Sequence, residues 1–115
     1  MRPRGRVEAN NEMRDKLIGS LQALPDVTLS LWKATELLCV YYNGKEIAHF
    51  QDIDEIDIRL TPAIIKQKGL TPPENSTSHP DRSKNSRWIV QSFQNEEDIV
   101  AVTELVEIAA TLREK

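Results

Sequence analysis

The chain has 115 residues, of which 39% are hydrophobic, and a chain of this size suits one compact domain that buries about two-thirds of its unfolded surface. Its formal net charge of −3 excludes the strongly basic surface of a general nucleic-acid binder, so we expect no nucleic-acid partner. No stretch approaches the ~18 apolar residues of a membrane helix, and the start lacks the apolar core of a secretory signal. We therefore expect a cytoplasmic protein with no membrane contact.

The N-terminal part predicts a helix followed by two strands. Residues 1–7 read as a basic, flexible tail, and residues 8–115 as a single domain. Apolar residues then recur at helical spacing until Pro25, namely Met13, Leu17, Ile18, Leu21 and Leu24. Alternation in DVTLSL (26–31) predicts a half-buried strand, and the apolar segment ELLCVYY (36–42) predicts a second one.

A hairpin is predicted next. Asn43 and Gly44 suit a two-residue type I′ turn, because both central residues of that turn need positive φ. KEIAHF (45–50) should therefore pair antiparallel with the strand before it. The polar residues 51–55 read as a loop, and IDIRL (56–60) alternates as a further strand.

The C-terminal half predicts a short helix, a long loop, a strand and a last helix. Thr61 and Gly69 bracket the helix AIIKQK as its N-cap and its left-handed end. Residues 71–85 are polar and rich in proline, which predicts a long loop and rapid amide exchange there. RWIVQSF (87–93) reads as a strand. Asn95 then caps a helix whose apolar stripe is Ile99, Val102, Val106, Ala109 and Leu112.

The predicted order is α-β-β-β-β-α-β-α, which has too many hairpins for a doubly wound parallel sheet. We expect an α+β fold with an antiparallel sheet of about five strands and helices packed mainly on one face. The opposite face should then be open to water or to a partner.

The stretch HFQDIDEIDIRL (49–60) concentrates polar residues that the predicted register brings together. If the two strands pair across the 51–55 loop, His49 lies opposite Asp57, and Arg59 follows two residues along on the same face. A carboxylate beside an imidazole favours the charged imidazolium, and an arginine fork binds carboxylate or enolate oxygens. The simpler interpretation of the same residues is an exposed ladder of opposite charges.

Other candidate sites are weaker. The acidic residues of 52–57 lack the ligand order of a calcium loop, and two histidines without paired spacing do not specify zinc, so we expect no metal ion. Cys39 lies in an apolar strand, which predicts an inert buried thiol. The segment HPDRSKNSRW (79–88) places basic residues around Trp88, which suits either phosphate binding or a solvated loop beside a core tryptophan.

Several short motifs, taken together, resemble the luciferase-domain family of small bacterial proteins. They are GKEIAHF, IDIRLT, the helix ending at Gly69, a later HP, RWIV and EEDI. The resemblance covers about residues 24–112. By this likeness, the characteristic H, D-x-R, H and W positions of the family correspond to His49, Asp57, Arg59, His79 and Trp88. Fungal luciferases that share the domain name resemble cofactor-independent oxygenases acting on a hydroxylated pyrone, which implies no cofactor. The arrangement of elements is also similar to that of MmcQ/YjbR-like proteins.

Two classes of function follow. The first is a small-molecule-binding or enzyme-derived domain, in which His49, Asp57, Arg59, His79 and Trp88 bind an anionic or phenolic ligand. The second is a non-enzymatic module that binds a protein partner or a second copy of itself through the open sheet face or a sheet edge. The first requires a concave site, and the second requires a flat or apolar exposed surface.

Overall fold

A computed structural model describes residues 6–31, 38–52, 54–71 and 86–114 of the chain. In chain order its elements are α1 (Arg6–Gln22), β1 (Val27–Leu31), β2 (Leu38–Tyr42), β3 (Lys45–Asp52), β4 (Glu55–Arg59), α2 (Pro62–Gln67), β5 (Trp88–Ser92) and α3 (Glu96–Glu114). This is the predicted order of elements. The α+β class is therefore confirmed.

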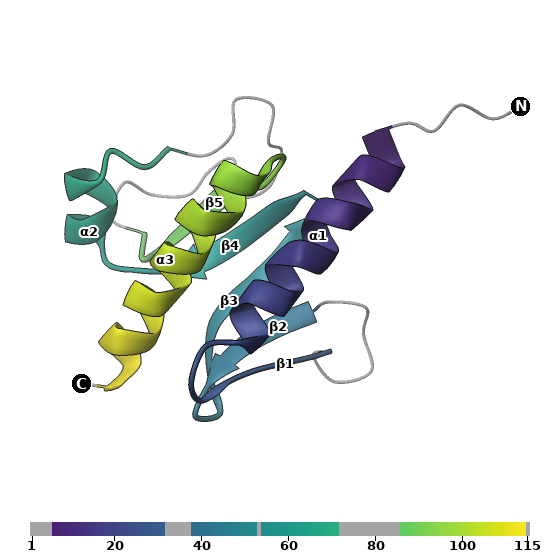
Figure 1. Ribbon diagram of the computed structural model, residues 1–115. Helices are drawn as coiled ribbons and strands as arrows, with labels where there is room; N and C mark the ends of the chain where they lie inside the picture. Colours follow the sequence, from purple (N-terminus) through teal and green to yellow (C-terminus); the bar gives the residue numbers. More distant parts are fainter. Residues whose placement is uncertain (1–5, 32–37, 53, 72–85, 115) are drawn as a thin grey trace, which may run out of the picture.

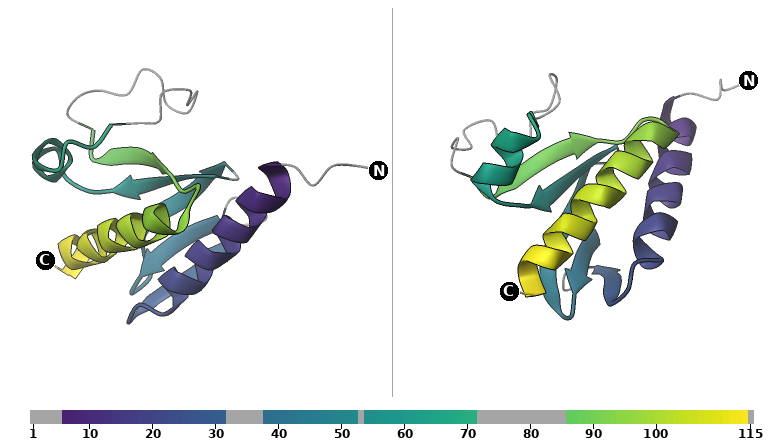
Figure 2. Two further views of the ribbon diagram at one scale, coloured as in Figure 1. Left: turned by 45° about the horizontal axis from the view of Figure 1, so that its top comes forward. Right: turned by 60° about the vertical axis from the view of Figure 1, so that its left-hand side comes forward.

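The five strands form one sheet in the order β1-β2-β3-β4-β5, and each strand pairs antiparallel with its neighbours. Helices α1 and α3 lie side by side across one face of this sheet, while α2 lies at the end of β4 (Figures 1 and 2). We call the covered face the helix face. The opposite face carries His49 and is called the histidine face.

The apolar core lies between the helix face and the two long helices. Phe50 and Phe93 meet there edge to face with ring centroids 5.7 Å apart, and both side chains are buried. From α3, the predicted stripe points into this core: Val102, Val106 and Ala109 are buried. Burial of such side chains is the main favourable term in folding, at about 25 cal/mol per Å² of apolar surface.

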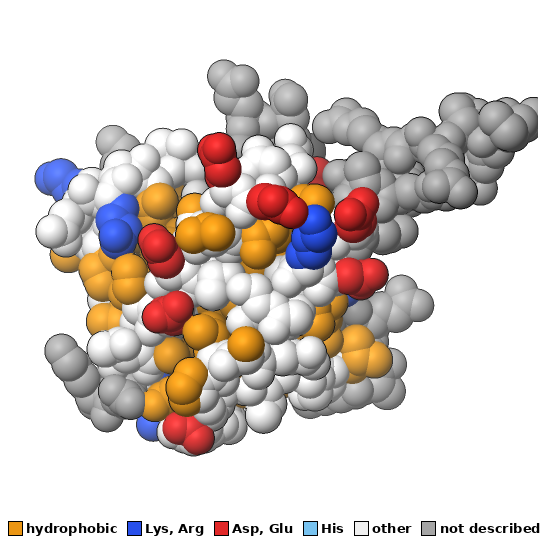
Figure 3. Space-filling model, in the orientation of Figure 1, with side chains coloured by type: hydrophobic (Ala, Val, Ile, Leu, Met, Phe, Trp, Pro, Cys, Tyr) orange, Lys and Arg blue, Asp and Glu red, His pale blue; other side chains and the backbone are white. Residues whose placement is uncertain are grey.

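Polar contacts link α1 to α3 above the core. Lys16 Nζ lies 2.7 Å from Glu96 Oε1, and the hydroxyl groups of Ser20 and Thr103 lie 2.9 Å apart. Figure 3 shows this side of the molecule, where acidic side chains are spread among apolar ones and do not form one patch. The exposed ion pair adds little stability, so the helices are positioned mainly by their apolar stripes.

The turn and cap residues adopt the conformations that the sequence predicts. Asn43 and Gly44 have φ values of 50° and 81°, as the two central residues of a type I′ turn require. Thr61 Oγ1 accepts a hydrogen bond from the Ile64 N–H at the start of α2, and Gly69 follows that helix with φ 64°. The Asn95 side chain accepts a hydrogen bond from the Asp98 N–H at the start of α3.

Some element boundaries differ from the prediction. Strand β3 continues to Asp52, which pairs with Glu55, so the predicted 51–55 loop shrinks to the two residues between them. Helix α1 begins at Arg6, inside the predicted tail. Of the predicted 71–85 loop, residues 72–85 lie outside the described part of the chain.

Candidate functional site

One row of side chains crosses the histidine face from strand to strand. The cross-strand pairs Ser30–Cys39, Cys39–His49, His49–Asp57 and Asp57–Val90 place these five residues in line. The predicted register of β3 and β4 is confirmed, including His49 opposite Asp57. A histidine and an aspartate therefore lie at the centre of the sheet.

Asp57 is fully buried, with a relative exposure of 0%. Two other members of the row, Cys39 and Val90, are buried as well. The interpretation of this stretch as an exposed charge ladder is therefore wrong for Asp57, because the histidine face is covered at its centre. A buried carboxylate is costly unless it is paired and hydrogen-bonded, so its environment decides whether the fold tolerates it.

A β-bulge in β3 adds Glu46 to the site. Val40 pairs with Ala48 while Tyr41 pairs with Glu46, so Ile47 is an extra residue without a cross-strand partner. The bulge lets Ile47 join Ala48 in the core and turns Glu46 to the side of His49. Strict alternation would have placed Ile47 beside His49 and Glu46 on the helix face.

The His49 ring lies among three acceptors. Its Nε2 lies 3.3 Å from Asp57 Oδ2 and 3.1 Å from Gln51 Oε1, so Nε2 carries a proton. Its Nδ1 lies 3.4 Å from Glu46 Oε2 but is buried and makes no hydrogen bond. The second ring nitrogen is thus close to a carboxylate without the geometry of a formed bond.

These carboxylates favour the charged form of His49. Burial of the ring lowers its pKa, but the hydrogen bond to Asp57 and the charges of Asp57 and Glu46 outweigh burial and raise the pKa above 6.5. The His49 side chain is 17% exposed, and that of Glu46 is 36% exposed. Glu46 is therefore the more exposed member of this pair.

Trp88 and Arg59 belong to the same end of the histidine face. The ring centroids of Trp88 and His49 lie 5.1 Å apart with an interplanar angle of 40°. Arg59 pairs with Trp88 across β4 and β5, which places both on one side of the sheet. Burial, together with the nearby charges of Arg113 and Arg87, lowers the pKa of Arg59, which still remains a cation.

Cys39 is buried, as predicted, yet it lies in polar surroundings. Burial and the neighbouring Glu46 raise the pKa of Cys39 to about 11. Burial and contact with Cys39 also raise the pKa of Tyr41. The thiol is therefore protonated at neutral pH and is a poor nucleophile.

Glu46 and Gln51 belong to the site but were not predicted from the sequence, and one predicted residue lies outside the described part of the chain. Gln51 follows the alternation of β3 from His49 and was open to prediction from period two. For Glu46 the signal is the pair Ile47 and Ala48, because two adjacent apolar residues between polar ones interrupt alternation. His79 lies outside the described residues.

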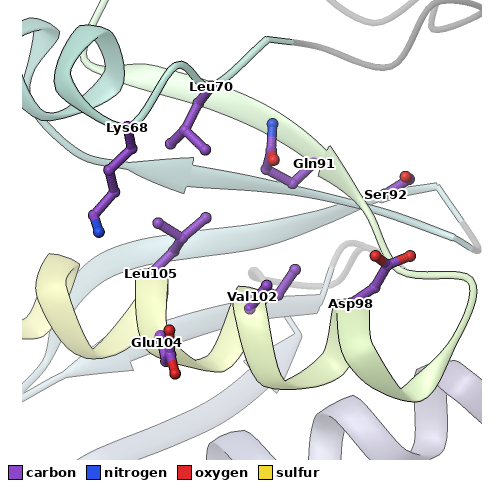
Figure 4. A pocket seen from close by; sticks show the side chains of 9 residues that line it. Lys68, Leu70, Gln91, Ser92, Asp98, Val102, Glu104 and Leu105 are labelled. Carbon is purple, nitrogen blue, oxygen red and sulfur yellow. The ribbon is translucent and has the colours of Figure 1, made fainter.

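Two grooves open elsewhere on the surface. One, of about 310 Å³, lies between α2, β5 and α3: Leu70, Val102 and Leu105 face one another across it, with Lys68 near one end (Figure 4). The other, of about 210 Å³, lies beside Pro25. Neither is lined by His49, Asp57, Arg59 or Trp88, so the candidate site is not part of either groove.

Among the described residues, no group of three or more His, Cys, Asp or Glu side chains is arranged to hold a metal ion. None of the helices in the described ranges is long and apolar enough to cross a membrane.

Comparison with known proteins identifies one family. No curated protein and no solved structure matched the chain. The family description "Luciferase domain" matches residues 44–109, which is more than half of the 115 residues and includes β3, β4, α2, β5 and most of α3. His49, Asp57, Arg59 and Trp88 all fall in the matched segment. The chain belongs to the luciferase-domain family.

Proposed function

We propose that the histidine face binds a small, flat, anionic or phenolic molecule, with His49 as its central polar contact. The buried pair of Asp57 and His49 is the observation that carries the proposal. A fully buried carboxylate beside an imidazole is costly for a fold of this size, and perturbed titratable groups of this kind are concentrated at functional sites.

His49 would act through Nδ1. Asp57 and Gln51 both contact Nε2. These contacts fix the orientation of the ring and leave Nε2 unavailable to a ligand. Nδ1 has no hydrogen bond and faces the partly exposed Glu46. A ligand oxygen that displaces Glu46 would accept the Nδ1 proton or hydrogen-bond to it, and Glu46 would exchange protons with solvent.

Trp88 and Arg59 suggest the class of ligand. The indole ring lies against His49 and offers an aromatic surface on which a flat ring can stack. Arg59 brings a positive charge to the strand end beside Trp88, where a carboxylate or an ionised hydroxyl would be stabilised. Hydroxylated aromatic acids, phenols and pyrones combine these features.

A ligand-detected NMR screen tests this proposal directly. A library of small carboxylates, phenols and pyrones is mixed with the full chain, and binders are titrated against the variants Arg59→Gln and Trp88→Phe. Since a charged hydrogen bond contributes about 1.5–3 kcal/mol, Arg59→Gln should weaken binding of an anionic compound by about tenfold or more.

Lys66→Gln is the matched control, because it also removes one positive charge, but from an exposed position on α2. It should leave the affinity unchanged. Equal losses in Arg59→Gln and Lys66→Gln would show that net charge, and not the histidine face, governs binding. A library without any binder would remove the support for a small-molecule site.

A further inference from the structure

The two edges of the sheet differ in how their backbone groups are bonded. β1 and β5 are the edge strands. On β5, the Ser86 hydroxyl hydrogen-bonds both the N–H and the C=O of Trp88, at 3.1 and 3.2 Å. The Gln91 amide donates to the C=O of Val90 and also to the C=O of Thr71. Side chains therefore occupy much of the outer edge of β5.

The outer edge of β1 has no such cover among the described residues. The Asn43 N–H donates to the Asp26 C=O, and hydrogen-bonded pairs alternate along antiparallel strands. Thr28 and Ser30 therefore point their backbone groups at β2, whereas Leu29 points its N–H and C=O outwards. Within the described part of the chain, no donor or acceptor meets these two groups of Leu29.

Side chains on β1 make this edge suitable for pairing. The strand VTLSL carries no charged residue, although charges are a common means by which edge strands avoid pairing. Leu31 is 56% exposed, and it is one of two large hydrophobic side chains that are exposed in the described residues. The other, Val100, lies on α3 and is 60% exposed.

We propose that β1 pairs antiparallel with β1 of a second copy of this chain about a twofold axis at Leu29. In this register the Leu29 N–H of each copy donates to the Leu29 C=O of the other, and the Leu31 N–H donates to the Val27 C=O of the other copy. Leu31 then lies against Val27 and Leu29 of the second copy. On the opposite face, Thr28 lies beside Ser30, where two hydroxyl groups can hydrogen-bond.

The second copy is favoured over a different strand because the edge is complementary to itself. Twofold pairing places apolar Leu31 opposite apolar Val27, and it uses both outward groups of Leu29 without bringing charges together. In such a pair the free edge of each copy is β5, and growth would require one β5 to meet another, where side chains already bond the N–H and C=O of Trp88 and the C=O of Val90. The association therefore closes at two copies. Strand β1 also precedes the matched segment 44–109, so the interface involves a part of the chain outside it.

Sedimentation velocity over a range of concentrations tests the pairing. The full chain should reach a concentration-dependent dimer, and Leu31→Lys should raise the dimer dissociation constant by at least about tenfold, because a charge on an edge strand opposes pairing. Val100→Lys is the matched control, since it adds the same charge at a similarly exposed apolar position on α3. It should dimerise like the unmodified chain.

Amide exchange at Leu29 gives a readout that is independent of the variants. Its N–H should exchange fast in dilute solution and slowly in the dimer, while the Thr28 N–H, bonded to β2, should be protected in both. A chain that stays monomeric at the highest concentration, a dimer that survives Leu31→Lys unchanged, or an equally fast Leu29 exchange at all concentrations would overturn the proposal.

Discussion

The two faces of the sheet are stabilised by different kinds of interaction. On the helix face, Ile56, Ile58 and Phe50 pack against α1 and α3 mainly through apolar contacts. On the histidine face, Asp57 is as deeply buried as its neighbours Ile56 and Ile58 on the same strand, but the imidazole ring of His49 lies 3.3 Å from its carboxylate. Adjacent residues of β4 therefore lie in two buried regions, an apolar one on the helix face and a polar one on the histidine face.

Because of this difference, the two faces should respond differently to substitutions. Apolar burial is non-directional, so the helix face loses stability roughly in proportion to the volume removed. A buried ionic pair depends on geometry and on both partners being present, so the histidine face responds to pH and to the loss of a single oxygen. Variants that change one face only therefore separate the two responses.

The largest effect is expected for Ile58→Ala on the helix face. The side chain is fully buried between the sheet and the long helices, and its removal leaves a cavity. The free energy of unfolding should fall by about 2–5 kcal/mol. Urea denaturation followed by circular dichroism measures this loss, and a change below about 1 kcal/mol would mean that the core repacks around the gap.

A smaller effect is expected on α3. Val106 is fully buried, whereas the next residue, Glu107, is exposed. Val106→Ala should lower the free energy of unfolding by about 1–3 kcal/mol, and Glu107→Ala should change it by less than about 0.5 kcal/mol. Denaturant melts of both variants compare the two sides of one helix. Equal losses would show that α3 presents a different side to the sheet.

The smallest effect is the pH dependence of the histidine face. Since the pKa of His49 is raised in the folded chain, its charge stabilises the fold fully below the unfolded value of about 6.5, and this contribution is lost as pH rises through the folded pKa. The slope between the two pKa values is at most about 1.4 kcal/mol per pH unit. Asp57→Asn should lower the pKa of His49 and reduce this slope.

Proton NMR of the His49 ring, in a His79→Asn background that leaves one imidazole, measures the pKa with and without Asp57→Asn. Unfolding at several values between about pH 6 and 8 measures the slope. A His49 pKa that is near 6.5 and insensitive to Asp57→Asn would contradict the pairing.

Much of the fold follows from local signals in the sequence. Asn43 and Gly44 fix the hairpin, and the two-residue period of IDIRL then fixes which residues share a face, so the partner of His49 could be predicted. Thr61 and Asn95 predicted the starts of two helices, because their side chains accept hydrogen bonds from backbone N–H groups three residues away. Each of these features depends on neighbours in the chain.

The rest depends on contacts between distant segments. Periodicity assigns Asp57 to a face but does not indicate what covers that face, so its complete burial was not predicted. Alternation also fails at a bulge, which is why Glu46 was missed although it lies only three residues from His49. The open edge at Leu29 is likewise a property of the whole sheet order, since a strand is an edge only by its place among the others.

The extra residue in β3 has a consequence for how this segment tolerates insertion and deletion. Because Ile47 has no cross-strand partner, the chain before it and the chain after it keep separate alternation. Deleting Ile47 would restore a uniform strand in which Glu46 still pairs with Tyr41 and His49 still pairs with Cys39, so the acid would stay on the histidine face while the core lost one apolar side chain. In an ungapped alignment anchored at His49, a relative that is one residue shorter here would have its acid set against Ile47, which lies on the opposite face.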